Sequence, residues 1–402
     1  MSYDYFEDLL NQQSVFKDES KLDINFIPEK LPYREKELSL LSQLFLSLLK
    51  NPNKTSRKVL ITGKTGIGKT VTVKLFSRIL KQAAEKRNLN INPIHINCRK
   101  ERTSYKILVK ILQFFNPNIP NRGYSFQDLL GFLEINLNNT NVHLVIILDE
   151  LGYLIGQNDE DLLYSLTRIN DERYNEPLKL SLIGIIRDLT YLDKLDVSTI
   201  STLQRNIIKF SPYSFDQISE ILGYRIEVSI IENAFSEETI EMISKIIWRN
   251  ADIRHGLDLI WKSAKIAESK NRRYISPEDI RIANQGLIPF SIHEKLKYLS
   301  SAKLIFLLSI VRQLKNGNKN KVTINYVLED YSLLCENLER TPKSYSQLWN
   351  YLQEFEREDL INLSIVSGNI IGRKAFIEIL DTPLLKLKKI IYNILKTKGI
   401  II

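Results

Sequence analysis

Residues Gly63–Thr70 read GKTGIGKT and lie between an apolar segment, Val59–Gly63, and a stretch with helical spacing. This is the pattern of a P-loop, which joins a buried strand to a helix. Its glycines let backbone N–H groups close around a phosphate, Lys69 reaches the β and γ oxygens, and Thr70 can bind Mg²⁺. A glycine-rich turn without a nucleotide would not need a lysine followed by a threonine. The predicted nucleotide contacts here are Gly63, Gly66, Ile67, Gly68, Lys69, Thr70 and Val71.

The N-terminal half has the pattern of a parallel α/β sheet. Short β-branched runs alternate with helical stretches. The runs are apolar almost throughout, as expected for strands covered on both faces. The strand candidates are Val59–Gly63, the His95–Cys98 region, Leu144–Glu150 and Leu180–Arg187.

An acidic pair, Asp149 and Glu150, ends the third of these strands. Such a pair is a weak signal alone, but after a P-loop it indicates the Walker B acids. Asp149 would hold Mg²⁺ through water, with Thr70 as the second metal residue, and Glu150 would polarise the attacking water. The expected cofactors are therefore ATP or ADP and Mg²⁺, with Lys69, Asp149 and Glu150 as catalytic residues.

A helical unit follows the α/β part. After Phe210 the strand signals stop, and three stretches show the apolar spacing of helices. The predicted helices are Phe215–Ser229, Ser236–Asn250 and Arg254–Ser269, and a further helix starts at Ser276, with Pro277 in its first turn.

The last unit, from about Ile292, has the element order of a winged helix. In such domains the third helix enters the major groove, and the hairpin wing lies along the backbone or the minor groove. Its predicted helices lie near Leu296–Asn316, Thr323–Leu338 and Ser344–Asp359, and its strands are Ile361–Val366 and Ile370–Ile379, joined by a turn at Ser367–Asn369.

The start of the third helix and the wing carry candidate DNA contacts. Cations and hydroxyls at a helix N-terminus can meet phosphates, which the helix dipole also attracts. The candidates are Arg340, Lys343, Ser344, Tyr345 and Gln347 on the helix, and Arg373 and Lys374 on the wing. Leu348, Trp349 and Leu352 are expected to be core residues. The alternative for the cations is a solvated face.

A second basic cluster follows the second strand and contains Arg99, Lys100, Arg102 and Lys106. Solvated surface and DNA contact fit it equally, and Arg99 and Arg102 are the DNA candidates. The whole chain favours a polyanionic partner, because 56 Lys+Arg against 47 Asp+Glu give a formal net charge of +9.

The composition excludes several classes of protein. The 402 residues include two cysteines, Cys98 and Cys335, which allow neither a disulfide framework nor a four-cysteine zinc site. The first ten residues carry acids where a secretory signal carries bases, and no apolar run approaches the roughly 18 residues that cross a bilayer. A cytoplasmic protein without membrane contact is expected.

Further segments match a known family: Val15–Ser20, Leu31–Glu35, Asn97–Arg99, Thr103–Tyr105, Leu162–Asn170, Ser211–Tyr213 and Ala251–Arg254. With the P-loop and the winged helix, they resemble the archaeal replication initiators related to the eukaryotic origin recognition complex and the licensing helicase loader. The likeness covers nearly the whole chain, and these motifs are far more specific than a P-loop alone.

The resemblance implies an AAA+ P-loop base with a parallel five-stranded sheet (residues 1–209), an all-α lid (210–290) and a winged-helix DNA-binding domain (291–402). It also implies DNA contact by a helical insert after the second strand. The positions that match nucleotide-side residues are Pro32, Tyr33 and Arg34, near the adenine pocket, and Tyr213, Arg225 and Arg254, the last at the lid position called sensor 2.

Three positions depart from the family pattern. Arg187 stands where the family has an asparagine that orients the attacking water. Ser198 stands at the arginine of the Leu-Asp-Pro-Arg-Val segment, which can serve a neighbouring subunit's ATP. The Walker B stretch runs Asp149-Glu150-Leu151-Gly152, without the family's usual following acid. Nucleotide binding is expected to survive, whereas hydrolysis is expected to be weak, with Arg187 and Arg254 as further catalytic candidates.

Three functions are compatible with these patterns. The first is a nucleoid-associated initiator that binds origin duplex DNA beside related initiator paralogues and helps to recruit the replicative helicase. The second is a DNA-binding regulator with a structural ADP and no effective ATPase cycle. The third is a signalling ATPase whose winged helix contacts proteins. The N-terminal segment and the cations of the last unit speak against the third.

Overall fold

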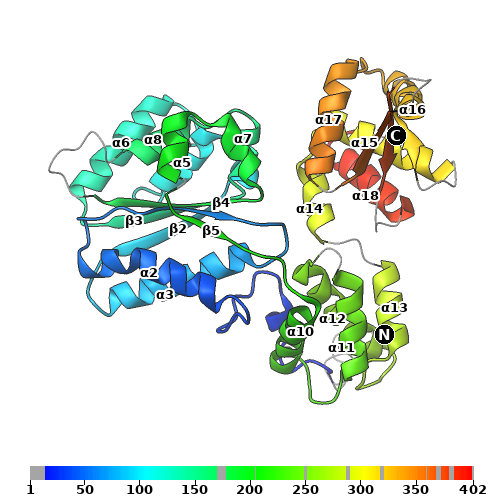
Figure 1. Cartoon of the computed structure of the whole chain (residues 1–402), viewed down its shortest axis with the longest axis horizontal. Coiled ribbons are helices and arrows are strands. Elements are labelled where there is room, and N and C mark those ends of the chain that lie inside the picture. Colours follow the sequence, from blue (N-terminus) through cyan, green and yellow to red (C-terminus); the bar gives the residue numbers. More distant parts are fainter. Residues whose placement is uncertain are drawn as a thin grey trace, which may run out of the picture. The chain divides into compact units, whose positions relative to one another are not determined.

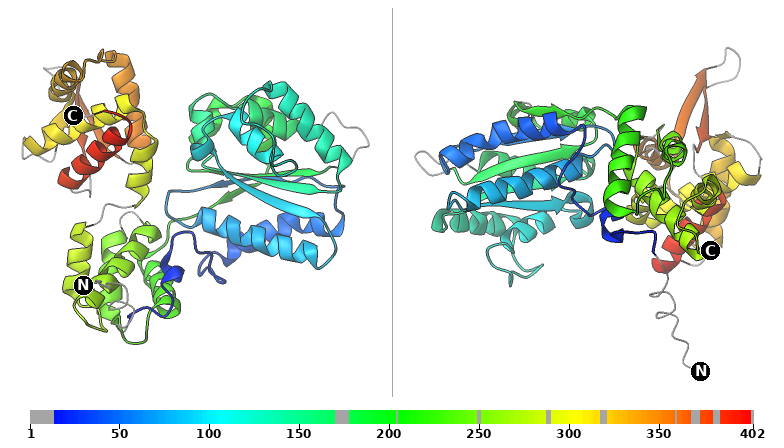
Figure 2. Two further views of the ribbon diagram at one scale, coloured as in Figure 1. Left: turned by 180° about the vertical axis from the view of Figure 1, so that it is seen from behind. Right: turned by 90° about the horizontal axis from the view of Figure 1, so that it is seen from below.

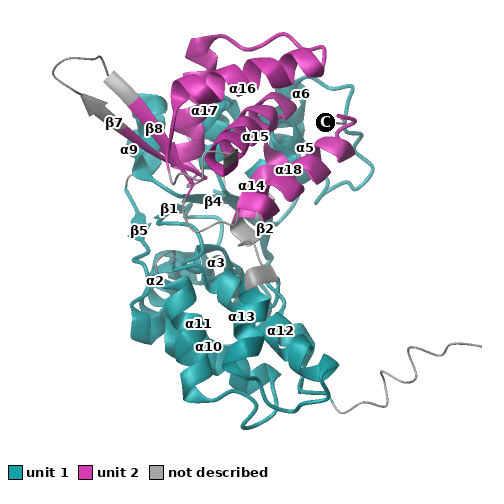
Figure 3. Cartoon of the chain, turned by 90° about the vertical axis from the view of Figure 1, so that its right-hand side faces the viewer, with its two compact units in different colours: residues 1–284 teal, residues 285–402 magenta. Residues whose placement is uncertain are grey.

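The computed structural model describes residues 14–169, 178–203, 205–248, 251–286, 290–316, 321–358, 360–367, 373–379 and 384–400. The chain forms two compact units, residues 1–284 and 285–402 (Figure 3). Within the described ranges, no helix combines the length and the apolar character needed to cross a bilayer.

The first unit is built on a parallel five-stranded sheet (Figure 1). Its strands are β1 (Lys58–Thr62), β2 (Ile91–Asn97), β3 (His143–Asp149), β4 (Leu180–Ile186) and β5 (Ile207–Lys209), in the order β2-β3-β4-β1-β5. The expected sheet and the four predicted strands are confirmed. β5 is not among the predicted strands, because its three residues are too few to give a periodic signal.

Helices cover both faces of this sheet (Figures 1 and 2). One face carries α2 (Glu35–Lys50) and α3 (Lys69–Glu85). The other face carries α5 (Ser104–Leu112), α6 (Phe126–Asn139), α7 (Gly152–Gly156) and α8 (Asp161–Arg168). A three-layer α/β/α arrangement of this kind leaves the carboxyl ends of the strands as the place where ligands bind.

The alternation of side chains along β3 positions the predicted Walker B acid. Every residue of β3 is buried. Leu144, Ile146 and Leu148 belong to the hydrophobic cluster that includes residues of α5, α6 and α8. Since successive side chains point to opposite faces of a sheet, Asp149 points to the face on which α3 begins. The chain therefore brings this carboxylate to the P-loop.

Four helices follow the sheet within the first unit: α10 (Phe215–Ser229), α11 (Glu237–Ile247), α12 (Ile253–Ser269) and α13 (Pro277–Gly286). Side chains cap all four of their starts, and at α13 the Ser276 hydroxyl accepts a hydrogen bond from the Asp279 N–H (3.4 Å). Ser214 forms a capping box with Gln217, and Ser236 and Asp252 cap α11 and α12. The predicted all-α lid is confirmed, although the end of the helix predicted over Ser236–Asn250 lies outside the described residues.

The N-terminal segment packs along these helices. It contains a short 3₁₀ helix, η1 (Glu19–Leu22). Phe16 forms a β-bridge with Ile230. The Glu19 carboxylate accepts hydrogen bonds from the Trp261 indole (2.7 Å) and the Lys265 ammonium (2.8 Å), both on α12. The segment is therefore tied to the lid before it reaches the P-loop.

The second unit combines helices with a small antiparallel sheet of order β6-β8-β7. Its elements are α14 (Phe290–Tyr298), α15 (Ser301–Asn316), β6 (Val322–Thr323), α16 (Ile324–Asn337), α17 (Tyr345–Arg357), β7 (Asn362–Ser367), β8 (Arg373–Glu378) and α18 (Leu384–Thr397). Three helices followed by a hairpin form the expected winged helix.

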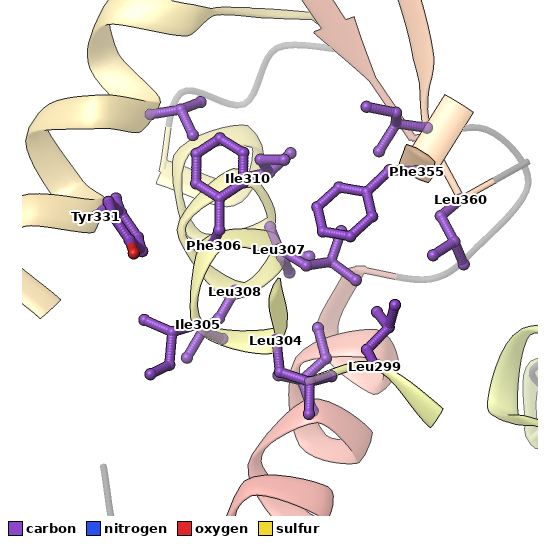
Figure 4. Close-up of a cluster of buried hydrophobic side chains, with 14 of the residues drawn as sticks. Leu299, Leu304, Ile305, Phe306, Leu307, Leu308, Ile310, Tyr331, Phe355 and Leu360 are labelled. Atoms are coloured by element: carbon purple, nitrogen blue, oxygen red, sulfur yellow. The ribbon is translucent and has the colours of Figure 1, made fainter. Parts of the chain in front are cut away.

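A cluster of buried side chains around α15 forms the core of this unit (Figure 4). The fully buried ring of Phe306 lies 5.3 Å from the Tyr331 ring on α16, edge to face, and 6.2 Å from the Phe355 ring on α17, stacked. Such aromatic pairs stabilise a fold by about 0.5–1.5 kcal/mol beyond the area they bury. These contacts fix α17, whose start carries the predicted DNA residues, against the domain core.

The structure corrects the sequence prediction for this unit at several points. The single helix predicted over Leu296–Asn316 is wrong, because α14 ends at Tyr298 and α15 begins at Ser301. The Ser300 hydroxyl accepts a hydrogen bond from the Lys303 N–H (3.4 Å), which is the bond of a helix N-cap. α18 is not among the predicted helices, although its buried residues have helical spacing. The predicted turn beyond Ser367 lies outside the described residues.

Candidate functional site

The P-loop joins β1 to α3, as predicted. Gly66 and Gly68 have φ angles of 82° and 89°, which residues with a side chain rarely adopt. A Cβ at Gly66 would lie 2.7 Å from Asp252 Oδ1, and a Cβ at Gly68 would lie 2.7 Å from the Tyr213 hydroxyl oxygen. Within the described chain, no side chain caps α3. The first N–H groups of α3 can therefore serve an anion.

Lys69 is the first residue of α3, and Val71 follows in the same turn. The Lys69 ammonium donates hydrogen bonds to the carbonyl oxygens of Gly63 (2.5 Å) and Lys64 (2.6 Å). Burial lowers the pKa of Lys69 to about 8, so the charged form is costly in this site. A phosphate anion would stabilise that charge.

The two predicted metal residues, Thr70 and Asp149, are in contact. The Thr70 hydroxyl donates a hydrogen bond to Asp149 Oδ2 (2.9 Å), and the Glu150 N–H donates one to Oδ1 (2.9 Å). Burial alone would raise the pKa of Asp149, but the contact with His95 and the hydrogen bonds from Thr70 and the Glu150 N–H lower it below its usual value. A hydroxyl and an ionised carboxylate are oxygen ligands of the kind that Mg²⁺ takes. The residues present therefore fit the predicted metal.

Glu150 leaves β3 with a left-handed backbone, φ 54°. A residue with a side chain in this region costs about 1–3 kcal/mol, and such residues cluster at functional sites. The turn directs the chain away from the sheet directly after Asp149. The predicted general base therefore stands at the sheet's carboxyl edge, next to the metal residue.

The two predicted catalytic arginines come from different elements. Arg187 follows β4, whose Ile186 is paired with Thr62 at the end of β1. Arg254 lies in the first turn of α12. Burial is the main cause of the lowered Lys69 pKa, and the charges of Arg187 and Arg254 add to it. The structure thus brings both guanidinium groups within electrostatic reach of Lys69.

Arg34 connects the N-terminal segment to the P-loop. Its guanidinium, only 4% exposed, donates hydrogen bonds to the carbonyl oxygens of Ile67 (2.8 Å) and Ser211 (2.8 Å). It also donates a hydrogen bond to the Tyr213 hydroxyl (2.9 Å), and its Cζ atom lies 4.0 Å from the centre of the Tyr213 ring. It also forms a salt bridge with Glu37 and lies over the Phe210 ring, 5.0 Å from its centre. The predicted nucleotide residues Arg34 and Tyr213 are therefore bonded to each other, and Arg34 holds the P-loop through the Ile67 carbonyl.

Three other predicted nucleotide residues lie where the N-terminal segment meets α10. Tyr33 follows Pro32 in a turn, has φ 66°, and donates a hydrogen bond to the Glu220 carboxylate. Arg225, on α10, donates through Nε to the carbonyl oxygen of Lys21 (3.1 Å). Burial lowers the pKa of Arg225 to about 10. The guanidinium of Arg225 thus holds the segment by its backbone.

The ring of Tyr191 packs against Gly152, the second residue after the Walker B pair. Gly152 begins α7, and a Cβ at this position would lie 2.9 Å from Cε2 of Tyr191 on η2 (Leu189–Lys194). Any acid at position 152 has a Cβ. A side chain at position 152 would therefore require the Tyr191 ring to shift.

We predict that Gly152→Ala lowers the free energy of unfolding relative to Gly156→Ala by about 1–3 kcal/mol, the usual cost of overpacking. Gly156 is the matched control, because it lies on the same helix and its Cβ would meet the Tyr191 ring at an ordinary 3.8 Å. Both changes replace a glycine by alanine within one short helix, so denaturant unfolding of the two variants compares the close contact with the ordinary one. Equal stabilities would show that the ring moves freely.

Ser198, at the predicted finger position, lies on α9 (Val197–Leu203). It accepts a hydrogen bond from the guanidinium of Arg168, the last residue of α8. The carbon of this guanidinium lies 4.2 Å from the centre of the Tyr164 ring. Arg168, from α8, therefore contacts Ser198, the position that matches the family's finger arginine. Sequence spacing gives no sign of this contact.

The apolar stripe of α17 is buried, as predicted. Leu348 and Leu352 are buried, and Trp349 is partly buried against the same core. Tyr345 differs, because it is 56% exposed and its ring stacks on Trp349 with centroids 6.4 Å apart. The structure separates the core residues of this helix from the side chain that is available for contact.

The start of α17 presents polar groups to solvent. Arg340, Lys343, Ser344 and Gln347 are all exposed. The Ser344 hydroxyl accepts a hydrogen bond from the Gln347 N–H (3.4 Å) and so caps the helix. Arg340 and Lys343 lie in the loop that leads into α17, and Ser344, Tyr345 and Gln347 lie at its N-cap and first turn, so the five candidates are close together in sequence at the start of this helix.

The other predicted DNA residues are less fully defined. Arg373 and Lys374 begin β8 and pair with Ser367 and Val366 of β7, while their side chains lie outside the described part. Arg99 is half-buried on α4 (Cys98–Glu101), and Arg102 is exposed at its C-cap. Solvated surface and DNA contact both fit Arg99 and Arg102.

Sequence reasoning missed one residue at the metal site. His95, on β2, has its Nε2 atom 3.4 Å from Asp149 Oδ2. Its position gave a signal, since it is a polar side chain near the end of the strand that pairs with β3. Tyr191 and Arg168 were also missed, because their contacts with Gly152 and Ser198 join separate stretches of chain.

Three family models match the chain in sequence order. Residues 53–190 match the AAA domain, residues 219–285 match the Cdc6 AAA+ ATPase-type lid domain, and residues 294–384 match the Cdc6 C-terminal winged helix domain.

The chain also matches whole proteins over nearly its full length. It is 31% identical over 384 residues to the ORC1-type DNA replication protein 2 of Sulfurisphaera tokodaii, covering 94% of this chain and 92% of that protein. The Aeropyrum pernix ORC1 protein in complex with DNA has a TM-score of 0.80 at 24% identity, covering 95% and 98% of the two chains. Cdc6p from Pyrobaculum aerophilum has a TM-score of 0.63 at 28% identity, covering 96% and 100%.

Proposed function

Since the chain belongs to the archaeal family of ORC1-type replication initiators, we propose that it binds ATP or ADP with Mg²⁺ and marks a replication origin by binding duplex DNA. The observation that carries the nucleotide part is the convergence of Lys69, the Thr70–Asp149 pair and Arg254 at the P-loop. Lys69 and Thr70 lie on α3, Asp149 ends β3 and Arg254 lies on α12 of the lid. A nucleotide bound there would contact the base and the lid together.

The DNA part rests on the exposed start of α17 and on the net charge of +9. The A. pernix relative is a complex with DNA, which supports the same use of the fold here. Arg340 and Lys343 would contact phosphates, and Ser344, Tyr345 and Gln347 would face base edges. Binding of this kind would place the protein on the nucleoid.

The proposal extends to partners and to the division of the chain. Residues 1–209 would form the nucleotide-binding base, 210–290 the lid and 291–402 the DNA-binding domain. Related initiator paralogues would bind DNA beside this chain, and the assembly would help to recruit the replicative helicase. The family's role in replication supports these steps.

A DNA-binding regulator with a structural ADP is the second candidate. Arg187 and Ser198 favour it, because each stands in place of a residue that the family uses in hydrolysis. In that case the nucleotide would hold the lid on the base, and no ATP cycle would occur.

DNase footprinting across the host chromosome, with and without ATP, tests the proposed function. We expect protection confined to origins. Protection at promoters that does not change with ATP would favour the regulator, and no protected site at any salt concentration would reject both.

For the wing, we predict that Arg373→Ala and Lys374→Ala each flatten the dependence of log affinity on log salt by about one unit, because each would remove one phosphate contact. Affinity should fall alike for all sequences. The measurement is a salt titration of duplex binding, with exposed Lys315→Ala on α15 as the control. An unchanged slope in both wing variants would remove the wing from the DNA interface.

A further inference from the structure

One polar side chain near the proposed metal site is not explained by the P-loop chemistry. His95 lies on β2 opposite Ile147 of β3, and Asn97 lies opposite Asp149. Since side chains alternate along strands, His95 and Asp149 point to the same face of the sheet. That face carries α3 and therefore Thr70.

The contact between His95 and Asp149 is close but incomplete. The distance between Nε2 and Asp149 Oδ2 is 3.4 Å, against 2.9 Å for the Thr70 hydroxyl on the same oxygen. Nε2 is buried and has no well-formed hydrogen bond within the described residues. A buried polar atom that lacks a partner destabilises the fold. The two atoms are close enough for a hydrogen bond, so a turn of the imidazole that aims its Nε2–H at Oδ2 would complete it.

We propose that His95 is a positioning residue for the divalent cation, acting through Asp149. In this arrangement, which rests on the proposed nucleotide function, the imidazole donates its Nε2–H to Oδ2. The Glu150 N–H already holds Oδ1. With both oxygens held, the carboxylate would keep its orientation even if the Thr70 hydroxyl left Asp149 to bind the metal.

The general chemistry of metal sites supports this role. Carboxylates at metal sites are themselves hydrogen-bonded, and loss of such a partner commonly lowers metal affinity by about 10–100-fold. Mg²⁺ demands near-ideal geometry and keeps several waters, so the direction of a carboxylate near its shell matters. The Asp149 side chain is only 5% exposed, which leaves solvent little room to replace the imidazole.

The test measures ADP affinity with Mg²⁺ and with EDTA for the wild type and two variants. His95→Phe keeps the ring shape without a nitrogen, and His95→Gln offers an amide donor at a similar reach. We expect His95→Phe to lower the gain in affinity that Mg²⁺ gives by about 10-fold, with affinity in EDTA unchanged. His95→Gln should restore part of that gain. Asn92→Ala, at the start of the same strand, should behave as the wild type.

The other outcomes reject either the role of His95 or the proposed nucleotide function. Wild-type Mg²⁺ dependence in His95→Phe overturns the inference, and so does an equal loss of affinity with Mg²⁺ and with EDTA, which would reveal a purely structural histidine. A wild type that binds ADP equally well in EDTA also overturns it but leaves nucleotide binding intact. A wild type that binds no nucleotide under either condition rejects the proposed function itself.

Discussion

Replacement of Lys69 by Ala is expected to lower nucleotide affinity by about 10²-fold. The Lys69 ammonium is the side-chain cation at the first turn of α3, and its present hydrogen bonds go to carbonyl oxygens of the loop itself. A charge-assisted hydrogen bond contributes about 1.5–3 kcal/mol, and each 1.4 kcal/mol is a factor of ten in affinity. Arg187 and Arg254 remain in the variant, so binding should fall steeply without vanishing.

The measurement is a titration with a fluorescent ADP analogue, together with the nucleotide content of the purified protein. Lys64→Ala is the matched control, because Lys64 lies in the same loop with an exposed side chain. It should keep wild-type affinity. DNA binding should weaken less than nucleotide binding in Lys69→Ala. Stoichiometric ADP in purified Lys69→Ala would contradict the assigned role of the lysine.

The P-loop and the Walker B pair were predictable because their signals are local. Gly63–Thr70 forms one continuous pattern, and Asp149 follows the apolar run Leu144–Leu148 at the end of a fully buried strand. The contact between Thr70 and Asp149 is expected once β1 and β3 are placed parallel in one sheet, because the P-loop and Asp149 then lie at the same carboxyl edge. His95 could not be assigned in this way, because its role depends on the register of β2 against β3, which the strand pattern does not fix.

Helices were predictable where apolar spacing and caps agree. α10 has the predicted bounds, Phe215–Ser229, because Ser214 and Gln217 form a capping box in front of its apolar stripe. The break between α14 and α15 was missed because Leu296 and Leu299 continue the apolar pattern across it. In that case a single hydroxyl, on Ser300, decides where the second helix begins.

Departures from a family pattern need the structure before they can be interpreted. At Gly152 a Cβ would meet the Tyr191 ring, and the Ser198 hydroxyl contacts the guanidinium of Arg168. Neither contact involves residues close in sequence. Sequence comparison shows that a residue has changed, whereas the neighbouring side chain gives the physical reason.

The rate of ATP hydrolysis is expected to be low in the isolated protein, with ADP held tightly. Phosphoryl transfer needs a positioned water and cationic stabilisation of the charge that develops on the γ-phosphate. An arginine finger alone can raise the rate by about 10³–10⁵-fold. Position 187 no longer carries an amide for the first task, and position 198 no longer carries an arginine for the second. A more typical paralogue beside this chain would then supply most of the turnover.

Single-turnover hydrolysis by the wild type and by Arg187→Asn decides how Arg187 acts. If Arg187 only displaces the water-orienting amide, restoring Asn should raise the rate, and the exposed control Arg281→Asn on α13 should have no effect. Arg187 also adds to the positive potential at Lys69, so an Arg187 side chain that contacts the γ-phosphate would offset part of the loss. A fast wild type that is slowed by Arg187→Asn would show that the arginine is catalytic and that its presence is not a defect.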